Sequence, residues 1–246
     1  MADAPAWLTG WAYAHRGLHD GDVPENSLLA FERAIATGLG IECDLRPSRD
    51  GRAMVFHDAE LDRLTGSAGT VAAMGVGDLT ALRLGQSDQH IPTLRDMLKL
   101  VAGRVPLLLE LKSDRGTAVH PLCRAVRREL EGYTGDVAVM SFDPRIGAWF
   151  ARRMAHLPRG LVVTEENART LSGAIKRRLS VHSARPQFLA YDIRDLPSRF
   201  ASAQARRGLP LLTWTVRSSA QLDTARECGA APIIEGAGVA AWENSS

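Results

Sequence analysis

The stretch Gly40-Ile-Glu-Cys-Asp-Leu45 decides the fold, because it has the pattern of a β-strand with two faces of opposite character. Alternate residues of a strand project to the same side, so Glu42 and Asp44 point together while Cys43 points the other way with its apolar neighbours. In an α/β barrel one face of each strand packs on the outer helices and the other faces inward. The stretch therefore predicts a barrel strand with an acidic inner face.

The stretch Pro106-Leu-Leu-Leu-Glu-Leu-Lys112 repeats this pattern further along the chain. The same alternation places Glu110 and Lys112 on one side of the strand and three leucines on the other. Active sites of such barrels gather at the carboxyl ends of the strands. We therefore expect the polar residues of both stretches to meet at that end.

Short apolar runs alternate with amphipathic stretches along the chain, which is typical of repeated βα units around a parallel sheet. About eight units can be counted, the number that closes a TIM-type (β/α)8 barrel, and this α/β fold is our prediction. Strands are expected over Trp11–His15, Gly40–Leu45, Pro106–Lys112, Asp136–Ser141, Gly160–Val163, Phe188–Tyr191, Pro210–Val216 and Ala231–Ile234. Helices are expected over Ser27–Thr37, Leu94–Val101, Gly116–Leu130, Pro144–Met154, Asn167–Leu179, Pro197–Arg207 and Ser219–Cys228.

The sequence between His57 and Ile91 is rich in glycine and weakly periodic. We expect this segment, residues 57–91, to be a small insertion after the second strand that folds over the active-site end of the barrel. No linker or repeat divides the rest of the chain, so residues 1–246 are expected to form a single catalytic barrel domain.

Composition excludes several classes of protein. The chain carries 30 basic and 28 acidic residues, a net charge of +2, and so has no broad positive field for nucleic acid. There is neither a secretory leader pattern nor a run of 18 apolar residues, which predicts a soluble, cytoplasmic protein without a stable membrane anchor. Four arginine pairs fall on expected outer helices and are interpreted as solvated faces: Arg127-Arg128, Arg152-Arg153, Arg177-Arg178 and Arg206-Arg207.

The three carboxylates Glu42, Asp44 and Glu110 predict a metal site. Carboxylates brought this close would repel one another and raise each other's pKa unless a cation lay among them. Oxygen ligands favour one hard divalent cation, Mg²⁺ or Ca²⁺, over zinc. Taken alone, Glu42 and Asp44 could also lie on a solvated strand edge, and Glu110 with Lys112 could be an ordinary ion pair.

Two histidines, His15 and His57, each close an apolar run and are followed at once by a polar residue. Cleavage of a phosphate ester needs one group that takes a proton and another that gives one, and a histidine pair can divide these roles near neutral pH. Arg16 is expected to hold a non-bridging phosphate oxygen, with a surface salt bridge as the alternative. The remaining histidines are interpreted as structural or surface residues: His19, His90, His120, His156 and His182.

Eight motifs in order give the chain a resemblance to the glycerophosphodiester phosphodiesterases, a metal-dependent family built on a TIM barrel. The motifs are A-H-R-G at 14–17, P-E-N-S at 24–27, G-I-E-C-D at 40–44, F-H-D-x-x-L-D-R at 56–63, I-P-T-L-x-D-M-L at 91–98, L-E-L-K at 109–112, S-F at 141–142 and T-W-T-V at 213–216.

The resemblance implies a role for each candidate site residue. Glu42, Asp44 and Glu110 would hold the metal, and His15 and His57 would serve as general base and acid. The phosphate would be surrounded by Arg16, Glu25 and Lys112, and Trp214 would line the pocket beside the glycerol. The expected reaction is hydrolysis of a small-molecule glycerophosphodiester to glycerol phosphate and an alcohol, which is a phosphoric diester hydrolase activity.

Two positions depart from the family pattern near the end of the chain. Arg217 stands where asparagine is usual, and Glu235 lies in a segment that usually contains threonine and aspartate. The positive charge of Arg217 suggests a preference for anionic headgroups. Two alternatives remain open: a lipid phosphodiesterase of the lysophospholipase D or sphingomyelinase D type, and a non-catalytic phosphate-binding barrel. The oligomeric state cannot be predicted.

Overall fold

The computed structural model describes residues 4–114 and 116–245 of the chain. The strands of this part form one sheet in the order β1-β9-β8-β7-β6-β5-β4-β2-β3, and eight of them close into a parallel barrel. The ninth, β3 (Ala53–Val55), runs antiparallel to β2 and lies outside the ring. The predicted (β/α)8 barrel is therefore confirmed.

Each of the eight expected strands is present in the barrel. The strands are β1 (Tyr13–Ala14), β2 (Gly40–Pro47), β4 (Leu107–Leu111), β5 (Val137–Ser141), β6 (Arg159–Val163), β7 (Phe188–Asp192), β8 (Leu211–Val216) and β9 (Ala230–Ile234). The first strand is shorter than expected, because only Tyr13 and Ala14 pair with β9. The chain divides into two compact units, one formed by Arg16–Val137 and the other by the residues before and after it.

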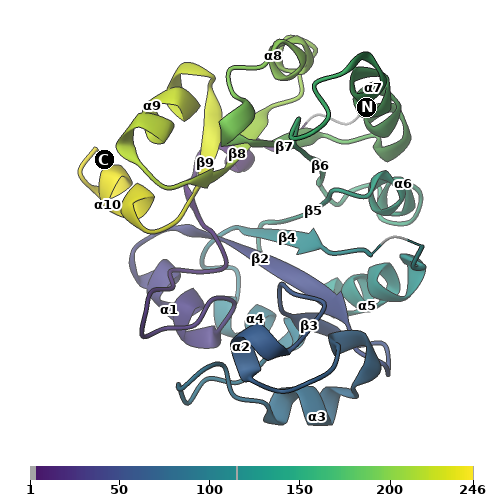
Figure 1. Ribbon diagram of the computed structural model, residues 1–246, viewed down its shortest axis with the longest axis vertical. Helices are drawn as coiled ribbons and strands as arrows, with labels where there is room; N and C mark the ends of the chain where they lie inside the picture. Colours follow the sequence, from purple (N-terminus) through teal and green to yellow (C-terminus); the bar gives the residue numbers. More distant parts are fainter. Residues whose placement is uncertain (1–3, 115, 246) are drawn as a thin grey trace. The chain divides into compact units, whose positions relative to one another are not determined.

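The helices of the unit Arg16–Val137 that follow its barrel strands or precede them are α1 (Leu28–Ala36), α4 (Leu94–Val101) and α5 (His120–Leu130), beside β2 and β4 (Figure 1). Helix α1 begins at Ser27, whose side chain accepts a hydrogen bond from the Ala30 amide, as the sequence predicts. Helix α4 begins at Thr93, which forms a capping box with Asp96. These caps fix where each helix starts relative to the neighbouring strands.

The segment between β2 and α4 has its own small core. Besides β3 it contains α2 (Asp62–Thr65), a 3-10 turn η2 (Val71–Ala73) and α3 (Val76–Ala81). Its buried apolar side chains pack together: Met54, Phe56, Leu61, Val71, Leu79, Leu84 and Ile91. The sequence pattern did not predict these short elements. That residues 57–91 are an insertion over the active-site end of one catalytic domain stays a prediction.

The other unit holds β1 and β5–β9 with the later helices of the chain (Figure 1). These helices are α6 (Pro144–Arg153), α7 (Leu171–Ala184), α8 (Arg199–Ala205), α9 (Ser219–Glu227) and α10 (Ala237–Glu243), with 3-10 turns η1 (Ala6–Thr9) and η3 (Ile193–Asp195). A core of leucine, valine and tyrosine side chains lies between β6–β9 and the helices α7 and α8.

Helix α7 differs from its expected span of Asn167–Leu179. It begins after Thr170, whose side chain accepts from the Gly173 amide, and it ends at Arg185 in the left-handed conformation, with φ of 49°. Pro186 follows and cannot continue the helix. None of the described helices has the length and apolar character needed to cross a membrane.

Candidate active site

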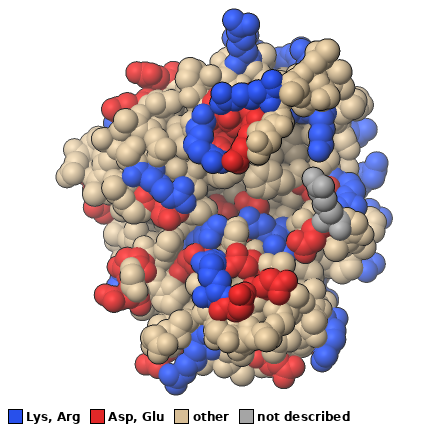
Figure 2. All heavy atoms as spheres, in the orientation of Figure 1, with Lys and Arg blue, Asp and Glu red and all other residues tan. Residues whose placement is uncertain are grey.

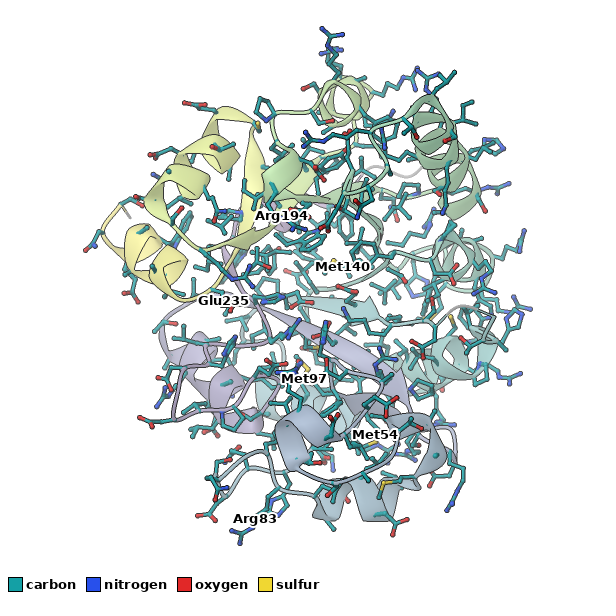
Figure 3. The ribbon with its side chains drawn as sticks, in the orientation of Figure 1. Met54, Arg83, Met97, Met140, Arg194 and Glu235 are labelled. Atoms are coloured by element: carbon teal, nitrogen blue, oxygen red, sulfur yellow. The ribbon has the colours of Figure 1, made fainter. Side chains whose placement is uncertain are left out.

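Strand β2 places its carboxylates on one side and its cysteine on the other. The Cys43 thiol donates to the sulfur of Met97 on α4 at 3.4 Å, so Cys43 faces the helix (Met97 is labelled in Figure 3). Glu42 and Asp44 flank Cys43 and therefore project from the opposite face. Each of these two residues is only 1% exposed. The alternation that the sequence predicts is the one observed.

The third carboxylate comes from β4. The register of the parallel strands pairs Asp44 of β2 with Glu110 of β4. One oxygen from each of Glu42, Asp44 and Glu110 lies within 4.8 Å of the other two. We call these three residues the carboxylate cluster. The fold brings together the residues that the sequence assigned to a metal, and all three are buried.

Two cations lie against the carboxylate cluster. The Lys112 ammonium is 2.6 Å from an oxygen of Glu110 and 2.9 Å from one of Asp44. The backbone N–H of Arg16 donates to Glu42 at 3.1 Å, and the Arg16 Nε is 3.2 Å from an oxygen of Asp44. Both cations thus contact the carboxylate cluster directly.

Negative charge on the carboxylate cluster remains unfavourable in spite of these two cations. Burial raises the pKa of Glu42 well above its ordinary value, and the charges of Asp44 and Glu110 raise it further. Burial opposes the charged form of Lys112, but Asp44 and Glu110 outweigh this effect and raise the pKa of the ammonium. A carboxylate whose charged form is disfavoured in its surroundings is stabilised by a divalent cation.

Arg16 is held by a second acidic residue, Glu25. The Arg16 Nη1 donates to Glu25 at 2.8 Å, and Arg63 donates to the same oxygen at 2.7 Å. The Arg16 Nε is buried and has no hydrogen-bond acceptor in the described part of the chain, since its approach to Asp44 is an ion pair without hydrogen-bond geometry. A buried guanidinium N–H without an acceptor is suited to donate a hydrogen bond to an anionic oxygen.

His57 is oriented by the residue that follows it. Its Nδ1 lies 2.7 Å from an oxygen of Asp58, and Asp58 also accepts from the Nε of Arg63. Burial is the main influence on His57 and lowers its pKa. With the Asp58 carboxylate at Nδ1, a neutral His57 carries its proton there and presents Nε2 as the acceptor.

Three contributors to this unit's polar network were not assigned as site residues from the sequence. Asn26 donates to Asp44 through Nδ2 at 3.1 Å, and Asp58 and Arg63 connect His57 to Glu25. All three lie inside the motifs P-E-N-S and F-H-D-x-x-L-D-R. Their place in these motifs could have identified them as site residues. Figure 2 shows acidic and basic side chains interleaved over the region of α2 and β2.

In the other unit, His15 follows β1 and meets a carboxylate from the end of β9. The Nδ1 of His15 lies 2.7 Å from an oxygen of Glu235, and the Arg217 guanidinium donates to the same oxygen at 2.9 Å (Glu235 is labelled in Figure 3). The two departures from the family pattern therefore contact each other, and one of them contacts a candidate catalytic histidine. Both residues can be read from the sequence, but their contact with each other could not be predicted from it.

Trp214 lies on β8 and is partly exposed. Its indole N–H donates to the Ala190 carbonyl at 3.0 Å, and its ring meets Phe142 edge to face with centroids 5.5 Å apart. Phe142 is itself 46% exposed. The two rings form an accessible aromatic surface, as a residue that lines a pocket requires.

Buried carboxylates with paired cations, and histidines held by carboxylates, are groups that a phosphoric diester hydrolase can use. The chain belongs to the Glycerophosphoryl diester phosphodiesterase family, whose model matches residues 15–235. The resemblance inferred from the motifs is confirmed.

Individual relatives agree with this family. A glycerophosphodiester phosphodiesterase of Caldanaerobacter subterraneus is 25% identical over 90% of this chain and 91% of its own. One from Bacillus altitudinis is 31% identical over 59% of this chain and 63% of its own length.

Solved structures share the fold. A phosphodiesterase of Oleispira antarctica, determined with the product sn-glycerol-3-phosphate, has a TM-score of 0.83 at 20% identity and covers 96% of this chain and 97% of its own. The glycerophosphodiester phosphodiesterase of Thermotoga maritima has a TM-score of 0.72 at 23% identity, with 91% and 93% covered.

Proposed function

We propose that this protein hydrolyses glycerophosphodiesters to glycerol phosphate and an alcohol such as choline or ethanolamine, in the cytoplasm and with one divalent cation, Mg²⁺ or Ca²⁺. The observation that carries the proposal is the buried carboxylate cluster of Glu42, Asp44 and Glu110 with Lys112 and Arg16 against it. Membership of the family supports the same reaction.

The carboxylate cluster fits a divalent cation. Its three side chains offer oxygen ligands alone, which is the preference of Mg²⁺ and Ca²⁺, and the raised pKa of Glu42 marks an uncompensated negative charge. A bound cation would supply charge stabilisation at a phosphoryl oxygen. Glu42, Asp44 and Glu110 would hold it, and few protein ligands leave coordination positions for substrate.

Arg16 and Lys112 would bind the non-bridging oxygens of the phosphate. Arg16 offers its buried Nε, which lacks an acceptor within the described residues, and Glu25 fixes the guanidinium from the other side. Lys112 is fixed by Glu110 and Asp44. These side chains are held in place before substrate arrives, so little reorganisation is needed when charge develops on the phosphate.

His15 and His57 would carry the protons as general base and acid. Each has a carboxylate at Nδ1, Glu235 for His15 and Asp58 for His57, which sets the tautomer and orients Nε2 for proton transfer. The lowered pKa of His57 keeps a larger neutral fraction near pH 7. Trp214 would line the pocket beside the glycerol.

Two chemical routes lead to the same products. Either a glycerol hydroxyl attacks phosphorus through a cyclic intermediate or water attacks directly. ³¹P NMR of early products separates them, because a cyclic glycerol phosphate forms only on the first route.

The headgroup hypothesis based on Arg217 is weakened by the structure. The Arg217 guanidinium pairs with Glu235 at 2.9 Å, so its charge is largely offset. We therefore expect glycerophosphoglycerol and glycerophosphocholine to be turned over at rates within about fivefold, the range that an exposed ion pair can influence. Parallel assays of the two substrates measure this ratio.

The function is tested by ³¹P NMR of glycerophosphocholine hydrolysis with metal-stripped protein, before and after addition of Mg²⁺ or Ca²⁺. We expect glycerol phosphate to form only with metal, and Asp44→Asn to abolish its formation. Glu60→Gln makes the same type of change at an exposed position and serves as the control. Full turnover in excess EDTA would contradict the proposal.

The same assay separates the alternatives. Faster cleavage of lysophosphatidylcholine or sphingomyelin than of glycerophosphocholine would favour a lipid phosphodiesterase. Binding of glycerol phosphate without turnover of any diester would favour a non-catalytic barrel.

A further inference from the structure

Few residues of helix α7 are buried. Of its 14 residues, Gly173 and Ala184 are the buried ones. Leu171, Ile175 and Leu179 are 80%, 51% and 63% exposed, and they account for three of the four large apolar side chains that are exposed in the described residues. Their spacing of four residues places them on one face of the helix, where they form a continuous apolar stripe.

Basic side chains border this stripe on both sides. Helical geometry places Arg178 and His182 along one edge and Lys176 along the other. The sequence of α7 contains no acidic residue. The outward face of α7 is therefore an apolar stripe with Arg178 along one edge and Lys176 along the other, which is typical of a helix that lies at a membrane interface.

A cavity of about 1290 Å³ lies beside α7 and continues this surface toward α8. Val181, Phe200 and Leu209 are among its apolar lining residues. Its basic lining residues include four arginines that have no ion-pair partner within residues 4–114 and 116–245: Arg178, Arg185, Arg199 and Arg207.

The acidic residues of the cavity do not neutralise these four arginines. Glu165 is paired with Arg177 at 3.4 Å, and Asp195 with Arg169 at 3.0 Å. Arg177 is only 13% exposed, so its interpretation as part of a solvated face is wrong.

Positive charge is concentrated in this part of the chain. Residues 171–207 contain eight basic and two acidic residues, whereas the whole chain has a net charge of only +2. Basic side chains protrude along the edge formed by α7 and α8 (Figure 2).

We propose that α7, together with the arginines of the adjoining cavity, is a docking surface for an anionic lipid bilayer. The apolar stripe of Leu171, Ile175 and Leu179 would enter the interface between headgroups and acyl chains, and the unpaired arginines would contact lipid phosphates. Nucleic acid would match the charge but not the apolar stripe. A bilayer matches both, and the attachment is peripheral because α7 does not span a membrane.

The test is flotation of the full chain with vesicles of phosphatidylcholine alone and vesicles that contain phosphatidylglycerol. We expect binding to the anionic vesicles only, and weaker binding as salt is raised. Arg178→Glu with Arg199→Glu should lower the partition coefficient at least about 25-fold, since each basic residue near an anionic surface contributes about fivefold. Both side chains are exposed, so the fold should tolerate the change.

Arg124→Glu with Arg152→Glu is the matched control, because it reverses two exposed arginines on α5 and α6. An equal loss in this control would overturn the proposal, since bulk charge would then explain binding. Leu171→Ser with Ile175→Ser and Leu179→Ser should also abolish binding at unchanged melting temperature. Retained binding in this variant would overturn it as well.

Two further outcomes would overturn the proposal. One is absence of binding to anionic vesicles at low salt. The other is a lipid-free dimer in sedimentation analysis that the triple serine variant dissociates, because the stripe would then be covered by a second copy of the chain. Each measurement is independent of catalysis, so failure of the proposed function leaves the vesicle result interpretable.

Discussion

The carboxylate cluster and the α7 surface are both regions of unbalanced charge, but they differ in burial. Glu42 and Asp44 are 1% exposed, whereas the side chains of Leu171, Ile175 and Leu179 project into solvent beside arginines. Burial in a low-dielectric site makes like charges costly, so a divalent cation would stabilise the cluster beyond what Lys112 and Arg16 supply. Exposed cations are screened by water and salt and can remain unpaired. The same type of imbalance therefore supports the proposed metal site in one region and the proposed weak, salt-dependent binding surface in the other.

The largest expected effect comes from breaking the carboxylate cluster. Asp44→Asn removes a metal ligand and the partner of Lys112 and Arg16. We expect kcat/KM for glycerophosphocholine to fall about 1,000-fold, the equivalent of about 4 kcal/mol in the transition state. Steady-state kinetics with saturating Mg²⁺ measures the loss, and circular dichroism checks the fold. A loss below tenfold would show that Asp44 is not part of the site.

A somewhat smaller loss is expected at the proton-transfer step. His57→Ala should lower kcat about 100-fold or more, because positioned general acid–base groups contribute factors of this size. The KM should change little, since His57 is not proposed to bind the phosphate. The partner variant Asp58→Asn should retain more activity than His57→Ala. Equal kcat values for His57→Ala and wild type would contradict this role.

The contact between His15 and Glu235 predicts a moderate effect. Glu235→Gln removes the charge that orients His15, and we expect kcat to fall about tenfold or more, which corresponds to a charged hydrogen bond of 1.5–3 kcal/mol. Arg217→Asn should cost less than about fivefold, because Arg217 is 56% exposed and surface ion pairs contribute little. The reverse order of the two losses would contradict a positioning role for Glu235.

The raised pKa of Glu42 predicts how stability depends on pH and metal. The folded state holds a proton on Glu42 that the unfolded state releases above about pH 4.5, so the metal-free protein loses stability as pH rises from there through the folded pKa. A bound cation removes this penalty. At one fixed concentration of Mg²⁺ or Ca²⁺, about 100 times the Kd at pH 8, the melting temperature should rise by about 5–10 °C at pH 8 and by less at pH 5.5, where protons compete with the cation.

Differential scanning calorimetry at the two pH values, with and without metal, checks this prediction. A shift of equal size at both pH values would mean that the cation does not replace a proton on the cluster. Glu60→Gln should leave the pH dependence of the shift unchanged.

The smallest effect is expected from the α7 surface. Leu171→Ser with Ile175→Ser and Leu179→Ser should leave kcat/KM for a water-dissolved diester within about twofold, since surface substitutions away from special features change little. A tenfold loss of kcat/KM would show that the α7 surface and the carboxylate cluster are coupled. The two regions would then not act separately. The assay is the one used for Asp44→Asn.

Strand pattern made much of the fold and of the cluster predictable. Gly40–Leu45 and Pro106–Lys112 are short, apolar and alternating, and strand geometry then fixes which side chains share a face. That is why Glu42, Asp44 and Glu110 could be grouped although Glu110 is far from the others in sequence. The short elements of residues 57–91 were missed because segments of three to six residues have no readable period.

Contacts between distant residues could not be predicted in the same way. Glu235 is 220 residues from His15, and no local pattern relates them. The α7 surface was missed for a different reason, since helical period alone does not show whether a stripe such as Leu171, Ile175 and Leu179 is covered. Arg177 has the sequence signature of a surface residue, but its guanidinium pairs with Glu165 and lies over the ring of Phe200.

Isothermal titration calorimetry of metal-stripped protein with Mg²⁺ and with Ca²⁺ tests the central claim most directly. We expect saturable uptake of one ion per chain by wild type and by Glu60→Gln, and none by Asp44→Asn. The absence of uptake by wild type, or uptake by Asp44→Asn with unchanged affinity, would contradict a metal site built from Glu42, Asp44 and Glu110.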